Sequence, residues 1–258
     1  MNRIEEKFNE LKNKGKKAFI PYICAGDSSL SQTENIIYTL ESAGADIIEL
    51  GIPFSDPLAD GPVIQASSIR SLKGGFCIEE FFETVKKIRK NSSIPLAAMV
   101  YYSTIFGYGR DKFFNLCSDS GIDGVIIPDL PYEEYDEIEE FISKTDLCLI
   151  PFVAITSKDR IPMIVEKARG FIYCVSSLGV TGERTSFHER TNDFISHVKN
   201  ISKVPVCVGF GISKRSDVEK FNSVADGCIV GSAIVRTIYE NNYDLQKLTD
   251  FVKNMIVI

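Results

Sequence analysis

Several features that mark common classes of protein are scarce or absent in this sequence of 258 residues. Positive charge does not predominate, because 29 Lys and Arg residues stand against 35 Asp and Glu residues, for a net charge of −6. Nucleic-acid binding usually requires a basic patch, so no nucleic-acid partner is expected. No apolar run approaches the about 20 residues that span a membrane. Residues 1–15 are typical of a charged amphipathic helix and not of a signal peptide.

Histidine and closely spaced cysteines are also scarce. His188 and His197 are the two histidines, and their spacing does not suit a shared metal ion. The seven cysteines are dispersed and form no CxxC motif, which argues against a zinc site or a redox pair. An odd number of dispersed cysteines, most of them in apolar runs, suits a reducing cytoplasm. We therefore expect a cytoplasmic protein without a metal site.

Short apolar runs, by contrast, recur along the whole chain, and segments with helical periodicity follow them. The runs are continuously hydrophobic, which is typical of parallel strands covered on both faces. They lie at residues 18–25, 47–53, 95–102, 124–128, 148–155, 171–176, 205–211 and 227–231.

Eight strand–helix units indicate an α/β fold with a single (β/α)₈ or TIM barrel. A doubly wound sheet gives the same alternation, but the count of eight and the absence of GxGxxG after the first run favour the barrel. Extra helices are expected at both ends, over residues 3–14 and 245–255. Because no linker or composition shift is present, residues 1–258 are predicted to form one domain.

Glu49 interrupts the second apolar run. Side chains alternate along a strand, so Ile48 and Leu50 share one face, while Ile47 and Glu49 share the other. The fully apolar face should meet the helices, which directs Glu49 into the barrel near the end where active sites form. Burial should raise the pKa of this carboxyl group toward neutrality, as general acid–base catalysis requires. The alternative is a structural glutamate, but no Lys or Arg lies in any predicted strand.

Acidic residues also follow the predicted strands in the loops. Asp56 and Asp60 lie in a loop stiffened by Pro53, Pro57 and Pro62. From the residues alone, each could serve a site or merely a turn or cap; Asp60, before Gly61, could cap the next helix. Asp129 follows the fourth run and is either a rival acid or an acceptor that fixes a loop.

Glycine-containing turns follow the sixth, seventh and eighth runs. TIM barrels often bind phosphate after strands seven and eight, through backbone N–H groups and a helix N-terminus. Ser232 is expected to act both as a helix N-cap and as a phosphate ligand. Residues 176–190 suit a lid, or else an ordinary surface loop. Aromatic side chains near strand ends could line a pocket for a flat substrate or simply pack in the core: Tyr22, Tyr102, Tyr173 and Phe210.

The sequence resembles the family of tryptophan synthase alpha subunits, most specifically through Glu-Leu-Gly-Ile-Pro-Phe-Ser-Asp-Pro-Leu-Ala-Asp-Gly-Pro at positions 49–62. Further matches are Phe-Ile-Pro-Tyr-Ile-Cys-Ala-Gly-Asp (19–27), Ile-Phe-Gly-Tyr-Gly (105–109), Pro-Asp-Leu-Pro (128–131), Gly-Val-Thr-Gly (179–182), Gly-Phe-Gly-Ile (209–212) and Gly-Ser-Ala-Ile-Val (231–235). The chain departs from the family pattern at Tyr22, at Ser103-Thr104 and at Ala154-Ile155-Thr156.

The resemblance implies a lyase that cleaves indole-3-glycerol phosphate to indole and glyceraldehyde 3-phosphate, a step in tryptophan biosynthesis. It implies that Glu49 moves protons at indole C3 and the glycerol hydroxyl, and that Asp60 binds the indole N–H. The matched substrate-binding residues are Tyr22, Tyr173, Thr181 and Phe210, and the matched phosphate-binding residues are Gly182, Gly211, Gly231 and Ser232.

The resemblance also implies a partner, the beta subunit, in an α₂β₂ hetero-oligomer. Pro53, Asp56 and Pro57 match the part of the loop that faces this partner. Pyridoxal phosphate is expected in the beta subunit, and no cofactor is expected in this chain. Two other interpretations stay open: a stand-alone lyase that releases indole, and a weakly active subunit that serves to activate the partner.

Overall fold

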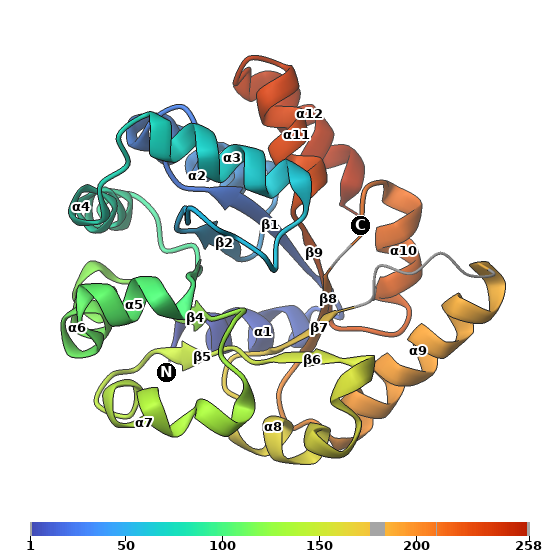
Figure 1. The fold of residues 1–258 in the computed structure, drawn as a ribbon. Helices are drawn as coiled ribbons and strands as arrows, with labels where there is room; N and C mark the ends of the chain where they lie inside the picture. Colours follow the sequence, from blue (N-terminus) through green and yellow to red (C-terminus); the bar gives the residue numbers. More distant parts are fainter. Residues whose placement is uncertain (1, 176–183, 210, 257–258) are drawn as a thin grey trace.

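The computed structural model describes residues 2–175, 184–209 and 211–256, and its strands form one parallel sheet (Figure 1). Within these residues the sheet has nine strand segments, in the order β5-β4-β3-β2-β1-β9-β8-β7-β6. The segments are β1 (Ala18–Cys24), β2 (Ile48–Gly51), β3 (Leu96–Met99), β4 (Gly124–Ile126), β5 (Cys148–Leu149), β6 (Phe152–Ala154), β7 (Ile172–Val175), β8 (Val206–Gly209) and β9 (Gly227–Val230).

The two ends of this order belong to one predicted strand, residues 148–155. Ile150 and Pro151 are the residues between β5 and β6. The Ile150 N–H donates to the Val125 carbonyl at 3.0 Å, and the Pro151 carbonyl accepts from the Tyr173 N–H at 2.9 Å. The fifth strand thus changes its partner from β4 to β7 midway, which closes the sheet. The predicted eightfold barrel is confirmed, with this strand divided into two segments.

Helices surround the barrel (Figure 1). The two predicted terminal helices are present as α1 and α12. None of the described helices has both the length and the apolar character needed to cross a membrane. The helices are α1 (Arg3–Asn13), α2 (Leu30–Ala43), α3 (Pro62–Lys73), α4 (Ile78–Arg89), α5 (Tyr102–Tyr108), α6 (Arg110–Ser120), η1 (Tyr132–Glu134), α7 (Asp136–Ile142), η2 (Ile155–Arg160), α8 (Ile161–Lys167), α9 (Arg184–Ile201), α10 (Arg215–Asn222), α11 (Ser232–Glu240) and α12 (Leu245–Met255).

Strand alternation divides the apolar residues between two layers. Ile48 and Leu50 of β2 pack in the cluster between the strands and the surrounding helices. Ile47 packs in a second cluster inside the barrel, together with side chains of α1. Because Glu49 lies two residues after Ile47, it shares the inner face of β2, as the sequence predicts.

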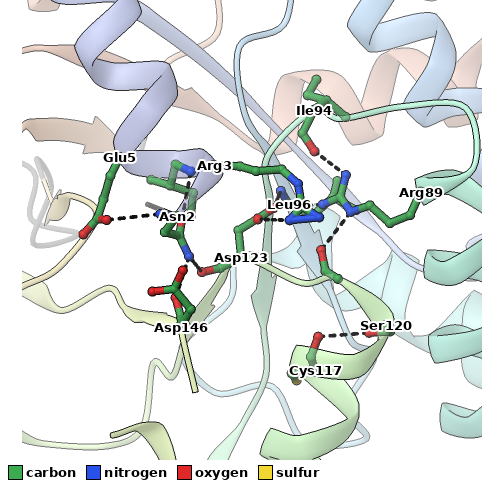
Figure 2. Close-up of polar contacts among 12 residues, drawn as sticks. Asn2, Arg3, Glu5, Arg89, Ile94, Leu96, Cys117, Ser120, Asp123 and Asp146 are labelled. Carbon is green, nitrogen blue, oxygen red and sulfur yellow. Dashed lines mark hydrogen bonds and ion pairs between the residues drawn. The ribbon is translucent and has the colours of Figure 1, made fainter. Parts of the chain in front are cut away.

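Helix α1 covers the end of the barrel where the strands begin. Ile4 and Phe8 pack in the inner cluster. Asn2 caps the helix by accepting from the Ile4 N–H at 2.9 Å, and its amide donates to the carbonyls of Asp123 and Asp146, both at 2.7 Å (Figure 2). These bonds attach the start of α1 to the residues that precede β4 and β5, so α1 is anchored across this end of the barrel.

Candidate active site

A cavity of about 560 Å³ opens at the other end of the barrel, where the strands end. Strand-end residues and the loops that follow β2, β8 and β9 line it. Several residues that are far apart in sequence meet here, and seven of the residues expected to bind or transform a substrate are among them: Tyr22, Glu49, Asp60, Tyr173, Gly211, Gly231 and Ser232.

Glu49 is the buried acid of this cavity. Its residue is 2% exposed, and it lies beside Tyr22 of β1 and Ala97 of β3 in the strand register. Burial, with a smaller contribution from the nearby Asp60 carboxylate, raises the pKa of Glu49 to about 8. Among the described residues, its carboxyl group has no hydrogen-bond or ion-pair partner. Glu49 is therefore protonated at neutral pH and free to transfer its proton.

Asp60 lies in the loop between β2 and α3. It does not cap α3, because Gly61 occupies the N-cap position and the Asp60 carboxylate accepts instead from the Tyr101 hydroxyl at 3.1 Å. Burial raises the pKa of Asp60 to about 6, although the Tyr101 hydrogen bond opposes this shift. At neutral pH the cavity thus presents a protonated Glu49 and an ionised Asp60.

Two tyrosines of the cavity wall occupy space left by glycines on neighbouring strands. A Cβ atom at Gly51 would lie 2.2 Å from the Tyr22 hydroxyl oxygen, and one at Gly209 would lie 2.3 Å from the Tyr173 hydroxyl oxygen. Tyr173 also packs against Phe152, with ring centroids 4.6 Å apart. Burial raises the pKa of both tyrosine hydroxyls, so they remain neutral. These rings give the cavity flat, largely apolar walls.

The loops after β8 and β9 form another part of the cavity wall. Gly211 has φ of +76°, a conformation that favours glycine. Gly231 is the N-cap of α11 and Ser232 is its first residue, so the expectation that Ser232 is the N-cap is wrong. The first N–H groups of a helix have no partner within the helix, and they carry its positive dipole end. This end of the cavity suits an anion such as a phosphate group.

Several of the predicted residues belong to segments that the structure does not describe. Thr181, Gly182 and Phe210 are outside the described residues. Helix α9 begins at Arg184, so the part of the expected lid from there to residue 190 is helical, and residues 176–183 lie outside the described residues.

Asp129, Asp56 and His197 lie outside the cavity. Asp129 accepts from the Tyr102 backbone N–H at 2.7 Å and thus fixes a loop. Asp56 is exposed in the loop after β2, where Pro53 and Pro57 are buried, and none of the three lines the cavity. His197 is exposed on α9. No cluster of three or more possible metal-ligating side chains occurs in the part of the chain that the structure describes.

Two residues of this region were missed by the sequence reasoning. Tyr101 bonds to Asp60, whereas the sequence reasoning named its neighbour Tyr102; two-residue alternation from Ala97 through Met99 could have identified Tyr101. Arg236 lines the cavity one helical turn beyond Ser232, and no described residue pairs with its guanidinium group. The helical spacing from Ser232 was the available signal for Arg236.

Comparisons with known proteins give a consistent result. The family model described as "Tryptophan synthase alpha chain" matches residues 8–256. The tryptophan synthase alpha chain of Lachnospira eligens is 46% identical over 255 residues, covering 98% of this chain and 97% of the relative. That of Clostridium kluyveri is 49% identical over 256 residues, covering 99% and 97%.

Solved structures agree with the sequence relatives. Tryptophan synthase subunit alpha from Legionella pneumophila superposes with a TM-score of 0.91 at 35% identity, covering 99% of this chain and 97% of that chain. A chain of tryptophan synthase from M. tuberculosis, in an aminoacrylate-bound form, gives a TM-score of 0.88 at 28% identity, covering 99% and 98%.

Proposed function

The chain belongs to the tryptophan synthase alpha chain family and is a lyase that cleaves indole-3-glycerol phosphate, and we propose that Glu49 and Asp60 carry out its chemistry. The observation that supports this assignment is the pairing of a protonated, buried Glu49 with an ionised Asp60 in one cavity. Environments that separate the pKa values of two carboxyl groups are typical of acid–base sites.

The protonated state of Glu49 suits the first step of the cleavage. Glu49 donates its proton to carbon C3 of the indole ring, which leaves a positive charge centred on the ring nitrogen. Asp60 accepts a hydrogen bond from the ring N–H and stabilises this charge more strongly than it stabilises the neutral substrate. Tyr22 and Tyr173 provide flat walls against which the ring can pack.

The second step breaks the carbon–carbon bond. The hydroxyl group on the carbon attached to C3 loses its proton and becomes the aldehyde carbonyl, and the electron pair of the broken bond returns to the ring. Glu49, ionised by the first step, accepts this proton and returns to its starting state. Indole and glyceraldehyde 3-phosphate are the products, and the proton count balances without another reactant.

The phosphate group is assigned to the loops after β8 and β9. Gly211, Gly231 and Ser232 offer close backbone approach and the N-terminus of α11. We add Arg236, which lines the same cavity and whose guanidinium group has no partner among the described residues. On the basis of the family resemblance, we also keep Thr181 and Phe210 as substrate-binding residues and Gly182 as a phosphate-binding residue.

Family membership implies a beta-subunit partner. We propose that Pro53, Asp56 and Pro57 face it in an α₂β₂ tetramer in the cytoplasm. The neighbouring Leu58 is 83% exposed, which supports an interaction surface on this loop. We further propose that pyridoxal phosphate belongs to the beta subunit, that this chain uses no cofactor, and that residues 1–258 form one domain.

The assignment of the two acids is tested by measuring indole formation from indole-3-glycerol phosphate, with and without the beta subunit. Glu49→Gln keeps the shape of the side chain and removes its proton transfer, so the rate should fall at least ~10²-fold. Asp60→Asn should cause a loss of similar order, because it removes the charge that stabilises the ring cation. Near-normal turnover in either variant would contradict the role of that residue.

Matched controls use exposed acids outside the cavity, Glu240→Gln and Asp119→Asn, which should keep the wild-type rate. The same assay distinguishes the proposed function from the stand-alone lyase and from the weakly active subunit that activates its partner. A stand-alone lyase releases indole at full rate without the beta subunit, whereas a subunit that only activates its partner stays inactive in both conditions.

A further inference from the structure

We infer that Tyr101 is a positioning residue that holds the Asp60 carboxylate in place, an inference that rests on the proposed role of Asp60. Tyr101 follows β3 and is 5% exposed. Its hydroxyl group donates to Asp60 Oδ2 at 3.1 Å and accepts from the Ala59 backbone N–H, also at 3.1 Å. Tyr101 itself does not line the cavity, so its effect on the substrate passes through Asp60.

Different hydrogen bonds hold the backbone and the side chain of Asp60. The Asp60 N–H donates to the Pro57 carbonyl at 3.0 Å, and the Asp60 carbonyl accepts from the Gln65 amide at 2.9 Å. These two bonds fix the backbone of the loop and leave the carboxylate free to rotate. Among the described residues, Tyr101 is the partner that fixes the carboxylate. Catalytic groups need such support, because small misplacements reduce the rate strongly.

Phe54 in turn fixes the ring of Tyr101. The two rings stack with centroids 4.8 Å apart and planes inclined by 20°. Phe54 directly follows Pro53 and lies two residues before the exposed Asp56, in the segment proposed to face the beta subunit. A contact at this segment that moved Phe54 would therefore move Tyr101 and Asp60 with it. The aromatic pair physically connects the proposed partner surface with the catalytic carboxylate.

Electrostatics gives the Tyr101 hydroxyl a second effect. A hydrogen bond donated to a carboxylate favours its ionised form. The Tyr101 bond thus lowers the pKa of Asp60 against the effect of burial. Removal of the hydroxyl alone should raise the pKa of Asp60 and leave less of the ionised form near pH 6.

The test compares Tyr101→Phe with Tyr38→Phe. Tyr38 on α2 is a close match, since its hydroxyl donates to Glu34 Oε1 at 3.1 Å and accepts from the Asn91 amide at 3.3 Å, away from the cavity. We expect Tyr101→Phe to lower kcat/KM for indole-3-glycerol phosphate about 10- to 100-fold, the scale of one hydrogen bond to a charged group. The acidic limb of its pH profile should move to higher pH, while Tyr38→Phe should match the wild type.

Phe54→Leu provides a second variant that keeps the Tyr101 hydroxyl. On its own, Phe54→Leu should lower kcat/KM less than Tyr101→Phe does. Combined with Tyr101→Phe, it should cause little further loss of kcat/KM, because both changes act on the same carboxylate. An unchanged rate and pH profile in Tyr101→Phe would overturn the inference. A loss of stability with an unmoved acidic limb would also overturn it, because a structural role alone explains that result. If Asp60→Asn is itself fully active, the proposed function has failed instead.

Discussion

Arg89 and Asp123 form a buried ion pair at the closed end of the barrel, with 2.8 Å between Arg89 Nη2 and Asp123 Oδ2 (Figure 2). The Asp123 carboxylate also binds Arg3 Nη1 at 2.7 Å and accepts from the Leu96 N–H at 2.8 Å. One side chain thus joins α1, α4 and the start of β3.

Asp123→Ala should destabilise the protein by about 3–5 kcal/mol, because it leaves Arg89 buried without its charged partner. Urea unfolding gives the change in free energy. Glu140→Ala is the control, since it removes an exposed pair with Lys144 and should leave the stability nearly unchanged. Activity of the folded variant should be retained, because Asp123 does not line the cavity. A loss below about 1 kcal/mol would contradict the importance of this network.

The pH dependence of cleavage should be bell-shaped. The proposed mechanism requires an ionised Asp60, whose pKa is about 6, and a protonated Glu49, whose pKa is about 8. The rate should therefore fall as the pH drops through about 6 and fall again as it rises through about 8. Stopped-flow measurement of a single turnover follows the chemical step, and both limbs report the interacting pair. A flat profile between pH 5 and 9 would refute the assigned protonation states.

Glu49→Gln should make the folded state less sensitive to alkaline pH. Burial raises the pKa of Glu49 from 4.5 to about 8, so between these values the folded state holds a proton that the unfolded state has lost. The wild type therefore loses stability as the pH rises from 4.5 to 8, by up to ~1.4 kcal/mol for each pH unit. The Gln variant cannot titrate at this position and should lack this loss.

Urea unfolding at several pH values measures the effect on stability. The advantage of Glu49→Gln over the wild type should grow between pH 5 and pH 8, while Glu240→Gln should follow the wild-type curve. Parallel curves for the wild type and Glu49→Gln would show that Glu49 is not buried in its protonated form.

Arg236→Gln should weaken binding of the phosphorylated substrate. Arg236 lines the cavity one turn along α11 from the N-terminus of this helix, where a phosphate group is proposed to bind. Loss of one charge-assisted contact should raise KM about tenfold and leave kcat nearly unchanged. Lys253→Gln on α12 removes the same charge away from the cavity and serves as the control. An unchanged KM would exclude Arg236 from the phosphate site.

Gly211→Val would be a less selective test of this end of the cavity than Arg236→Gln. Space is available beside Gly211, but its φ of +76° strains any β-branched residue. Both KM and stability should therefore change, which is why Arg236 gives the cleaner measurement.

The sequence by itself determined the barrel and the place of Glu49. The barrel follows from the recurrence of eight apolar runs, and the place of Glu49 follows from side-chain alternation along one strand. Both are local properties of the sequence, which do not require knowledge of the neighbouring strands. The family resemblance then predicted catalytic roles for Glu49 and Asp60, which the structure places in one cavity. The pattern of eight apolar runs predicted the number of strands, even though Ile150 and Pro151 divide the fifth one.

The partners and roles of the loop side chains depended on the tertiary structure alone. Asp60 could have been a cap, Asp129 a catalytic acid and Tyr102 a cavity residue, because each choice has similar local propensity. The choice depended on partners far away in sequence: Tyr101 binds Asp60, 41 residues distant, and the Tyr102 N–H binds Asp129, 27 residues distant. Strand periodicity is set within one segment, whereas loop hydrogen bonds are set by whichever segments the closed barrel brings together.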